Sequence, residues 1–285
     1  MRIVNDLDLT QYNSYRLKSI AKNAFFPETI DDLKKIIDNY DNLVILGGGN
    51  NTIFSKEYYA NENFVFIRGN FSGISLINDT TLHALAGTDM KTLSEEALKH
   101  SLTGLEYFYD IPGCVGGGVA MNAGAKGEFL GDYIIEVECM DIRTGSRCKF
   151  SKEDLFYSYR DSIFQHEPFY VIISATFSLQ KADYNAIKRK MEENYIDRNK
   201  KQPRDFPNAG SVFKRPEGHY VGPMVTECGL KGYSIGGAMV STKHAGFIVN
   251  YNNATSKDIL SLIEKVRSEV SKKFGVELVV EQRLI

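Results

Sequence analysis

The chain has 285 residues, of which 43% are hydrophobic and 25% are charged, and its formal net charge is −2. This composition is that of an ordinary globular protein, and the near-neutral charge excludes the basic surface that nucleic-acid-binding and membrane-binding proteins need. The length predicts about two domains at ~150 residues each. No apolar run approaches the ~18 residues of a membrane span and no signal-sequence core is present, so we expect a cytoplasmic protein.

The cysteines and histidines of the chain do not predict a metal or redox centre. No two cysteines have the two-residue spacing of zinc and redox motifs, so we expect all of them to be reduced. The histidines are scattered, with no ligand pattern, and we expect no metal. The cysteines are Cys114, Cys139, Cys148 and Cys228.

In chain order, the first predicted helix runs from Ile30 to about Asn39, where Thr29 and Asp32 resemble a capping box. A buried strand, Leu43–Leu46, leads directly into a glycine turn, Gly47–Asn51. The turn lacks both the dinucleotide fingerprint and the P-loop pattern. It is therefore either a tight turn or a backbone nest that binds an anion.

The next elements alternate between strands and helices. We expect strands at 64–68, 82–86 and 171–179, a hairpin at 134–150 around Thr144-Gly145, and helices at 92–100 and 183–200. The last of these helices ends before Pro203 and marks a domain boundary near 183.

Between the second of these strands and the hairpin lies the stretch Ile111–Ala125, which holds five of the chain's 24 glycines. Glycine allows positive φ and a close approach of the backbone to a ligand. Clustered glycines most often form an irregular loop. Here apolar residues alternate with the glycines, which favours a stretch buried against a cofactor.

In the second half, the glycine-containing stretch 208–216 opens a further domain, and a strand is predicted at Gly246–Asn250. Thr255 and Asp258 cap a helix with one apolar face, and Gly275 ends it. The final stretch, 276–285, is predicted to be a strand.

Several motifs, in this order, cover nearly the whole chain. They are Leu46-Gly-Gly-Gly-Asn-Asn51, Gly104-Leu-Glu106, Ile111-Pro-Gly-x-Val-Gly-Gly117, Met121-Asn-Ala-Gly-Ala125, Tyr159-Arg160-Asp-Ser162, Ala209-Gly-Ser-Val-Phe-Lys214, Gly229-Leu-Lys-Gly232, Ser241-x-Lys-His244 and Glu281-Gln-Arg283. With them the chain resembles the UDP-N-acetylenolpyruvoylglucosamine reductase family, in its shorter branch.

This resemblance implies an α+β fold, with a two-lobed FAD-binding domain of the vanillyl-alcohol-oxidase-like type followed by an α+β substrate domain. The FAD-binding domain would span 1–182, with its lobes divided near 70, and the substrate domain 183–285. The resemblance further implies non-covalent FAD, NADPH as the hydride source, and reduction of UDP-N-acetylenolpyruvoylglucosamine to UDP-N-acetylmuramate for peptidoglycan synthesis.

Three positions match the catalytic residues of the family. Arg160 would bind the substrate carboxylate, because a guanidinium is planar, permanently charged and able to make two parallel hydrogen bonds. Ser211 is implied as the proton donor to carbon, and Glu281 as the group that stabilises the enolate. Outside the motifs these residues would be interpreted as a solvated arginine, a turn serine and one half of a surface ion pair with Arg283.

The resemblance also implies binding residues. The predicted FAD-binding residues are Gly47, Gly48, Gly49, Asn50, Asn51, Pro112, Gly113, Cys114, Gly116, Gly117, Asn122, Gly124 and Arg283. Lys201, Lys214 and Arg215 are the candidates for the substrate diphosphate. The chain departs from the family pattern at Lys18, Ser19, Lys126, Arg215 and Gly246, and the change at Arg215 concerns substrate binding.

Two other functions fit the same residues less well. One is an FAD-dependent oxidase of the wider family, and the other is a non-catalytic nucleotide-sugar-binding protein. An oxidase does not need Arg160, Ser211 and Glu281, and a sensor could have lost them, so their joint presence favours the reductase. We expect the nucleotide sugar and NADPH as partners, no nucleic acid or membrane, and a monomer.

Overall fold

The structure, a computed structural model, describes residues 1–285. The chain divides into two compact units, and each unit is assembled from several stretches of sequence. Unit 1 comprises Met1–Asn5, Asn23–Gly48 and Asn61–Arg198. Unit 2 comprises Asp6–Lys22, Gly49–Ala60 and Asn199–Ile285. The mixture of antiparallel sheets and helices confirms the predicted α+β class.

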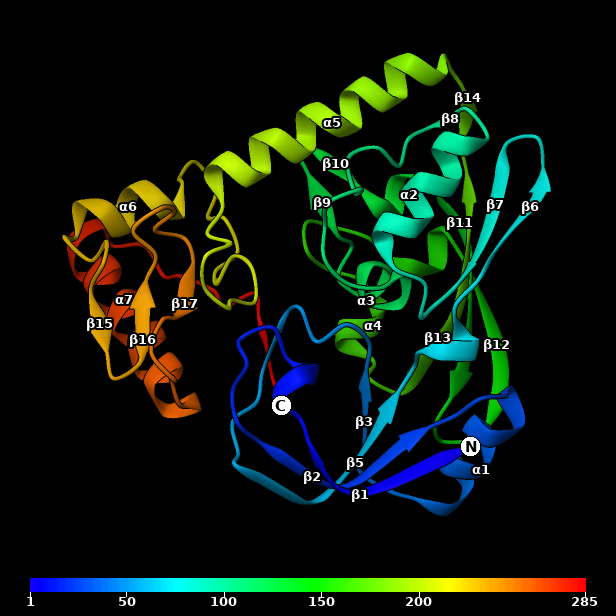
Figure 1. Cartoon of the computed structure of the whole chain (residues 1–285), viewed down its shortest axis with the longest axis horizontal. Helices are drawn as coiled ribbons and strands as arrows, with labels where there is room; N and C mark the ends of the chain where they lie inside the picture. The colour runs from blue at the N-terminus through cyan, green and yellow to red at the C-terminus, as the bar shows by residue number, and fades with distance from the viewer. The chain divides into compact units, whose positions relative to one another are not determined.

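The larger sheet of unit 1 is antiparallel throughout, and Figure 1 shows two helices beside it. Side chains of both helices share one apolar core with the central strands of the sheet. The strand order is β12 (Ser146–Ser151), β11 (Ile134–Asp141), β13 (Tyr170–Ser178), β7 (Thr81–Leu85) and β6 (Ile74–Asn78), and the helices are α2 (Met90–Lys99) and α3 (Val115–Ala120).

A second sheet has the order β1 (Arg2–Asp8), β2 (Ile20–Phe26), β5 (Tyr58–Phe66) and β3 (Leu43–Leu46), in which β3 and β5 are parallel. Helix α1 (Ile30–Asn39) begins at the predicted residue, because the Thr29 hydroxyl accepts a hydrogen bond from the Asp32 amide at 3.0 Å. The buried face of α1 consists of Leu33, Ile36 and Ile37.

The other elements before residue 202 are short, except for one long helix. That helix is α5 (Tyr184–Lys201), and the short helix is α4 (Ile163–His166). The short strands are β4 (Thr52–Ile53), β8 (Leu102–Thr103), β9 (Gly124–Ala125), β10 (Glu128–Phe129) and β14 (Gln180–Lys181). The 3-10 turns are Thr10–Tyr12, Gly69–Phe71, Leu130–Asp132 and Glu153–Leu155.

Unit 2 has its own apolar core beneath a three-stranded sheet, which Figure 1 shows beside its helices. The strands are β15 (Ser234–Ile235), β16 (Ala238–Val240) and β17 (Ile248–Asn250), and the helices are α6 (Val221–Glu227) and α7 (Ser256–Phe274). Helix α7 has the predicted capping box and ends at Gly275, whose φ is +67°. The short strand β18 (Arg283–Leu284) pairs in parallel with β4.

Two predicted elements differ from the structure. The stretch 276–285, expected to be one strand, forms only β18 and one bridge between Phe213 and Val280, and its backbone hydrogen bonds to Val212 and from Lys214 do not extend into a continuous ladder. The glycine stretch contains helix α3, although glycine has a low helix propensity. Packing explains this helix, since Val115 and Val119 are fully buried in the core of unit 1.

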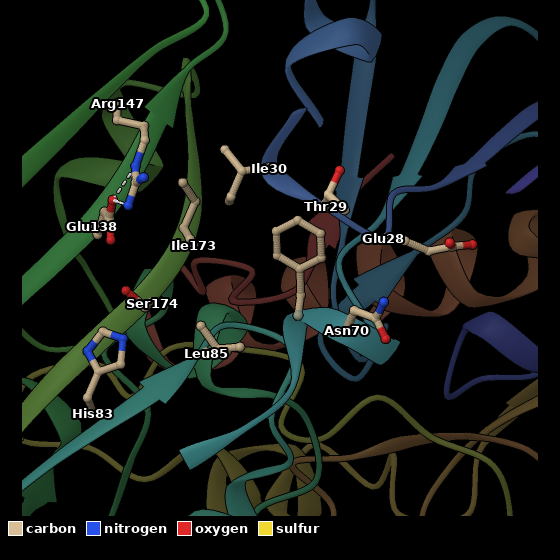
Figure 2. A pocket seen from close by; sticks show the side chains of 11 residues that line it. Glu28, Thr29, Ile30, Asn70, His83, Leu85, Glu138, Arg147, Ile173 and Ser174 are labelled. Atoms are coloured by element: carbon tan, nitrogen blue, oxygen red, sulfur yellow. Dashed lines mark hydrogen bonds and ion pairs between the residues drawn. The ribbon is translucent and has the colours of Figure 1, made fainter. Parts of the chain in front are cut away.

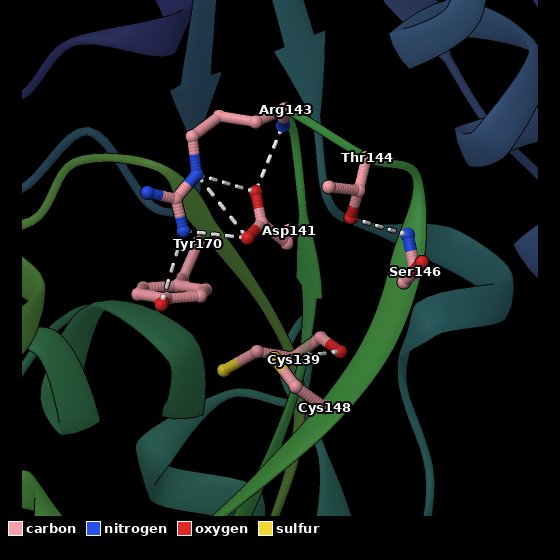
Figure 3. Close-up of polar contacts among 7 residues, drawn as sticks. All are labelled: Cys139, Asp141, Arg143, Thr144, Ser146, Cys148 and Tyr170. Atoms are coloured by element: carbon pink, nitrogen blue, oxygen red, sulfur yellow. Dashed lines mark hydrogen bonds and ion pairs between the residues drawn. The ribbon is translucent and has the colours of Figure 1, made fainter.

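The β11–β12 hairpin has a polar turn, and two cysteines lie opposite each other close to it (Figure 3). In the turn, hydrogen bonds from Arg143 lower the pKa of Asp141, whose Oδ1 also accepts from the Arg143 amide at 2.8 Å. Farther along, Cys139 and Cys148 lie opposite each other, and burial raises the pKa of both thiols. All four cysteines are free, as predicted.

Two glycines with the same φ of +67° provide a matched test of steric exclusion in unit 2. A Cβ on Gly49 would lie 2.0 Å from the Tyr12 carbonyl oxygen, whereas a Cβ on Gly275 would meet nothing within 4 Å. We expect Gly275→Ala to lower the free energy of unfolding by about 1–2 kcal/mol, the cost of the left-handed backbone alone. Gly49→Ala should cost more than about 3 kcal/mol, since the backbone must also move.

Urea unfolding followed by circular dichroism measures both variants. Equal costs for the two substitutions would contradict the close packing at Gly49.

Candidate active site

Arg160 lies in a two-residue turn of unit 1 with a strained backbone. Ser158 and Asp161 exchange two backbone hydrogen bonds of 3.2 Å, which leaves Tyr159 and Arg160 at the tip of the turn. The φ angle of Arg160 is +55°, in the left-handed region that residues other than glycine seldom adopt. Strain of this kind, which costs on the order of 1–3 kcal/mol, is concentrated at functional sites.

The Arg160 guanidinium points to the second half of the predicted cofactor loop. Its Nη2 donates to the Gly124 carbonyl at 2.8 Å, and its Nη1 donates to the Asn122 carbonyl at 3.4 Å. A Cβ on Gly124 would lie 3.0 Å from Nη1 and 2.6 Å from the Phe129 ring. Glycine at this position therefore allows the arginine to approach the backbone.

Side-chain amides hold this turn from both sides. Asn122 is buried, and its Nδ2 donates to the Ser158 carbonyl at 2.8 Å while its Oδ1 accepts from the Gly131 amide at 2.9 Å. Gln165 donates to the Arg160 carbonyl at 2.8 Å. Asn122 is also a predicted FAD-binding residue, and its side chain bonds the turn that carries Arg160.

The first half of the predicted cofactor loop contains helix α3 and its glycines. In helix α3, a Cβ on Gly116 would lie 3.0 Å from the Ala86 Cβ, so this glycine packs against the residue that directly follows strand β7. Gly117 is exposed, and a Cβ there would have only the Cys114 sulfur within 4 Å, at 3.9 Å. Pro112 is exposed as well. Pro112 and Gly117 are therefore the exposed residues of this half of the loop, and Gly117 has no side chain.

The glycine turn after β3 lies against this loop within unit 1. A Cβ on Gly47 would be 2.5 Å from the Cys114 sulfur, so the two predicted cofactor segments are in contact. Arg68 donates to the Gly47 carbonyl from Nη2 at 2.7 Å and from Nε at 3.2 Å. The sequence analysis did not identify Arg68 as a site residue, and its position as the last residue of the predicted strand 64–68 was the available signal.

In unit 2 the remaining residues of the turn contact the end of the chain. Asn50 donates from its side chain to the Ser14 hydroxyl at 2.8 Å. Asn51 donates from its side chain to the Glu281 carbonyl at 3.2 Å and accepts from the Arg283 amide at 2.9 Å. The structure thus brings predicted cofactor residues together with the predicted catalytic residue Glu281.

Ser211 and Glu281 lie on two segments that pair through the backbone. The Glu281 amide donates to the Val212 carbonyl at 2.8 Å, and the Lys214 amide donates to the Val279 carbonyl at 2.8 Å. Ser211 is exposed and precedes the paired Val212. Two predicted catalytic residues are therefore neighbours in unit 2, and Arg160 belongs to unit 1.

The predicted diphosphate-binding cations lie on two segments of unit 2. Lys201 is the exposed last residue of α5, whereas Lys214 and Arg215 follow Ser211. The Arg215 guanidinium lies 3.9 Å from the centre of the Tyr220 ring, and its Nε donates to the His219 carbonyl at 3.3 Å. Stacking holds this guanidinium at a defined place on the loop.

Two departures from the family pattern have local explanations. Lys126, with a φ of +56°, pairs with Asp197 at 3.5 Å. Burial lowers the pKa of His244, whose Nδ1 accepts from the Gly246 amide at 3.1 Å, so its imidazole is neutral there. A Cβ on Gly246 would lie 3.0 Å from that ring, which accounts for the glycine.

A cavity of about 310 Å³ in unit 1 is lined by residues of β7, β11, β12 and β13, of the start of α1 and of the turn Gly69–Phe71 (Figure 2). Its wall includes the ion pair of Glu138 and Arg147, and it contains none of the predicted site residues. It is therefore separate from the predicted active site.

Comparisons with known proteins agree with this geometry. The family model for the FAD binding domain matches residues 21–151, and that for the UDP-N-acetylenolpyruvoylglucosamine reductase C-terminal domain matches 202–285. A reductase of this name from Francisella tularensis is 41% identical over 98% of this chain and 99% of its own length. One from Clostridium botulinum strain Eklund 17B is 42% identical, over 97% and 91% respectively.

The chain belongs to the UDP-N-acetylenolpyruvoylglucosamine reductase family. The crystal structure of the reductase from Thermus caldophilus has a TM-score of 0.83 and 29% identity, and the match covers 99% of this chain and 98% of that one. These likenesses confirm the predicted two-part fold. No helix in the structure is long and apolar enough to cross a membrane.

FAD is the cofactor of this reductase family, and the residues of the chain fit it. The FAD binding model covers both glycine segments, which contact each other at Gly47 and Cys114. Exposed main chain at Gly117 is the surface that a diphosphate or a flat ring can approach. In unit 2, Arg283 is exposed beside Asn51.

We expect the purified protein to be yellow, because it binds FAD. It should release intact FAD on denaturation, because no covalent bond between the chain and the flavin is predicted. Absorption spectra of the filtrate and the pellet after heat denaturation measure this. A colourless protein that shows no FAD binding in a titration would contradict the assignment. Flavin that stays with the denatured chain would indicate a covalent bond, with Cys114 as the candidate.

Proposed function

We propose that Arg160, Ser211 and Glu281 carry out the reaction of this reductase, the NADPH-dependent reduction of UDP-N-acetylenolpyruvoylglucosamine to UDP-N-acetylmuramate. The activity follows from family membership over nearly the whole chain. The observation that best supports the residue roles is the backbone pairing of Val212 with Glu281, which makes the proposed proton donor a neighbour of the proposed enolate stabiliser. UDP-N-acetylmuramate is a precursor of peptidoglycan.

FAD, once reduced by NADPH, would supply the hydride that adds to the CH₂ carbon of the enolpyruvyl group. As that bond forms, negative charge develops at the neighbouring carbon and spreads into the carboxylate. Arg160 binds the carboxylate and stabilises this charge, because preorganised donors act most strongly where charge appears in the transition state. The clamped turn keeps its guanidinium in place before substrate binds.

Ser211 donates a proton from its hydroxyl to the carbon that carries the charge. Glu281, with its carboxyl protonated, donates a hydrogen bond to the enolate oxygen. General acid assistance of this kind typically contributes ~10²–10⁴-fold to a rate. The sum of the two transfers, one hydride and one proton, converts the enolpyruvyl ether into the lactyl ether of the product.

The remaining assignments concern binding. Lys201, Lys214 and Arg215 bind the substrate diphosphate, and Arg283 contacts the pyrimidine edge of the flavin. We assign FAD binding to residues 1–182 and substrate binding to 183–285, which the two family models at 21–151 and 202–285 support. We also propose a cytoplasmic monomer, and light scattering of the purified protein checks its mass.

Arg160→Lys should strongly reduce turnover although it keeps the positive charge. Lysine cannot make two parallel hydrogen bonds to a carboxylate, and it cannot reach both the Asn122 and Gly124 carbonyls as the guanidinium does. The loss should appear mainly in the oxidation of bound flavin by substrate, measured by anaerobic stopped-flow absorbance. Arg147→Lys, at the separate cavity, is the matched control.

The expected loss from Arg160→Lys is clearly more than twofold. A variant that stays within a factor of about two, less than ~1 kcal/mol of barrier, would exclude Arg160 as the carboxylate clamp.

Ser211→Ala should separate the two half-reactions. Reduction of bound flavin by NADPH needs no proton donor on the substrate side, so we expect its rate to be unchanged. Oxidation by the enolpyruvyl substrate should slow by ~10²–10⁴-fold, with substrate affinity little changed, because the hydroxyl acts mainly in the transition state. Ser234→Ala, an exposed serine of β15, is the matched control.

Anaerobic stopped-flow absorbance follows both half-reactions. Fast oxidation by substrate would exclude Ser211 as the donor, and slow reduction by NADPH would show that the serine instead shapes the flavin site.

A further inference from the structure

Gln282 is a polar residue buried between two predicted functional residues. It lies between Glu281 and Arg283 in the sequence, and only 5% of its surface is exposed. A buried amide is retained at little cost only where its donors and acceptor all find partners. Its neighbours therefore show what the side chain does.

The Gln282 amide crosses to the segment that carries Ser211. Its Nε2 donates to the Ala209 carbonyl at 3.0 Å and lies 3.4 Å from the Gly210 carbonyl. Backbone carbonyls only accept hydrogen bonds, so the amide nitrogen has to face them. The two residues directly before Ser211 are therefore held by a side chain from the segment of Glu281.

Tyr15 fixes the other end of the amide. Its hydroxyl donates to the Gln282 Oε1 at 3.0 Å, and the whole tyrosine is buried, with 0% exposure. Burial raises the pKa of Tyr15, so the hydroxyl keeps its proton and remains a donor. The Tyr15 carbonyl in turn accepts from the Asn250 side chain at 2.8 Å.

Ser211 is thus held on both sides by the segment of Glu281. The Gln282 side chain contacts Ala209 and Gly210 before it, and the Glu281 amide bonds the Val212 carbonyl after it. The serine is the one residue between these two attachments. Its own side chain is left exposed, as a proton donor to a bound substrate has to be.

We infer that Gln282 is a positioning residue for the reaction, which fixes the backbone of Ser211 relative to Glu281 through its amide and is itself oriented by Tyr15. This inference rests on the proposed roles of Ser211 and Glu281. A donor displaced by about 1 Å can lose on the order of 10²-fold in rate, so the effect of this amide should be large.

The main variant is Gln282→Met, which keeps the length of the side chain and removes its hydrogen bonds. We expect oxidation of bound flavin by the enolpyruvyl substrate to slow about 10- to 100-fold. Reduction by NADPH and the dissociation constant of the substrate should change by no more than about twofold.

Tyr15→Phe is a second, milder variant, which removes only the hydroxyl that orients the amide. It should slow the same step by a smaller factor. Tyr59→Phe is its matched control, because Tyr59 is equally buried in unit 2 and its hydroxyl bonds the Ile285 carbonyl instead. The control should leave the step within a factor of about two.

A double-mutant cycle with Ser211→Ala decides between positioning and a general loss of structure. If Gln282 acts through Ser211, Gln282→Met should slow the step less than about twofold further in the Ser211→Ala background. If Gln282→Met slowed the step equally in both backgrounds, the inference about Gln282 would be overturned. It would also be overturned if neither Gln282→Met nor Tyr15→Phe slowed the step in the wild-type background. Neither outcome would contradict the proposed role of Ser211. A Ser211→Ala variant with normal oxidation would overturn the proposed role of Ser211 first.

Discussion

The site in unit 1 depends on one interaction, the hydrogen bonding of the Arg160 guanidinium to the backbone of the glycine loop. The Gly124 carbonyl receives Nη2 at 2.8 Å, and a side chain at position 124 would occupy the space of the guanidinium. The glycines of this loop therefore do more than admit a cofactor. They also let an arginine with a left-handed backbone reach main-chain oxygens, and the amides of Asn122 and Gln165 stabilise that backbone.

In unit 2, the residue proposed to be catalytic is also held in place, but through backbone pairing and one side-chain amide. Ser211 is exposed on a loop that would be free to move by itself, but backbone pairing and one buried amide join it to the segment of Glu281. In both units, the side chain that we propose to be catalytic lies on a short irregular segment that a buried amide group stabilises. The positions of these two side chains therefore depend on supporting residues more than on helices or strands, since both segments lie outside regular secondary structure.

Local signals in the sequence were sufficient for much of the fold. Thr29 and Thr255 begin their helices as predicted, because a cap involves residues only three positions apart. Helix α3 could not be predicted, because burial of Val115 and Val119 overrides the low propensity of its glycines. The hydrogen bonds that support the site could not be predicted from the sequence either, because Asn122 and Ser158 are 36 residues apart and Gln282 and Ala209 are 73 residues apart. The motifs identified the candidate residues, and only the structure shows which contacts support them.

The contacts of Asn51 have a consequence for synthesis of the protein. Its side chain bonds the Glu281 carbonyl, 230 residues later, and β4 pairs with β18. Loop closure over such a separation is entropically costly, and contacts between distant parts of a chain slow folding. On the ribosome, the segment Gly49–Ala60 must wait for residues of Asn199–Ile285 to be made before unit 2 can close. During that interval the apolar residues of the segment lack their native partners, and exposed apolar surface of this kind favours aggregation.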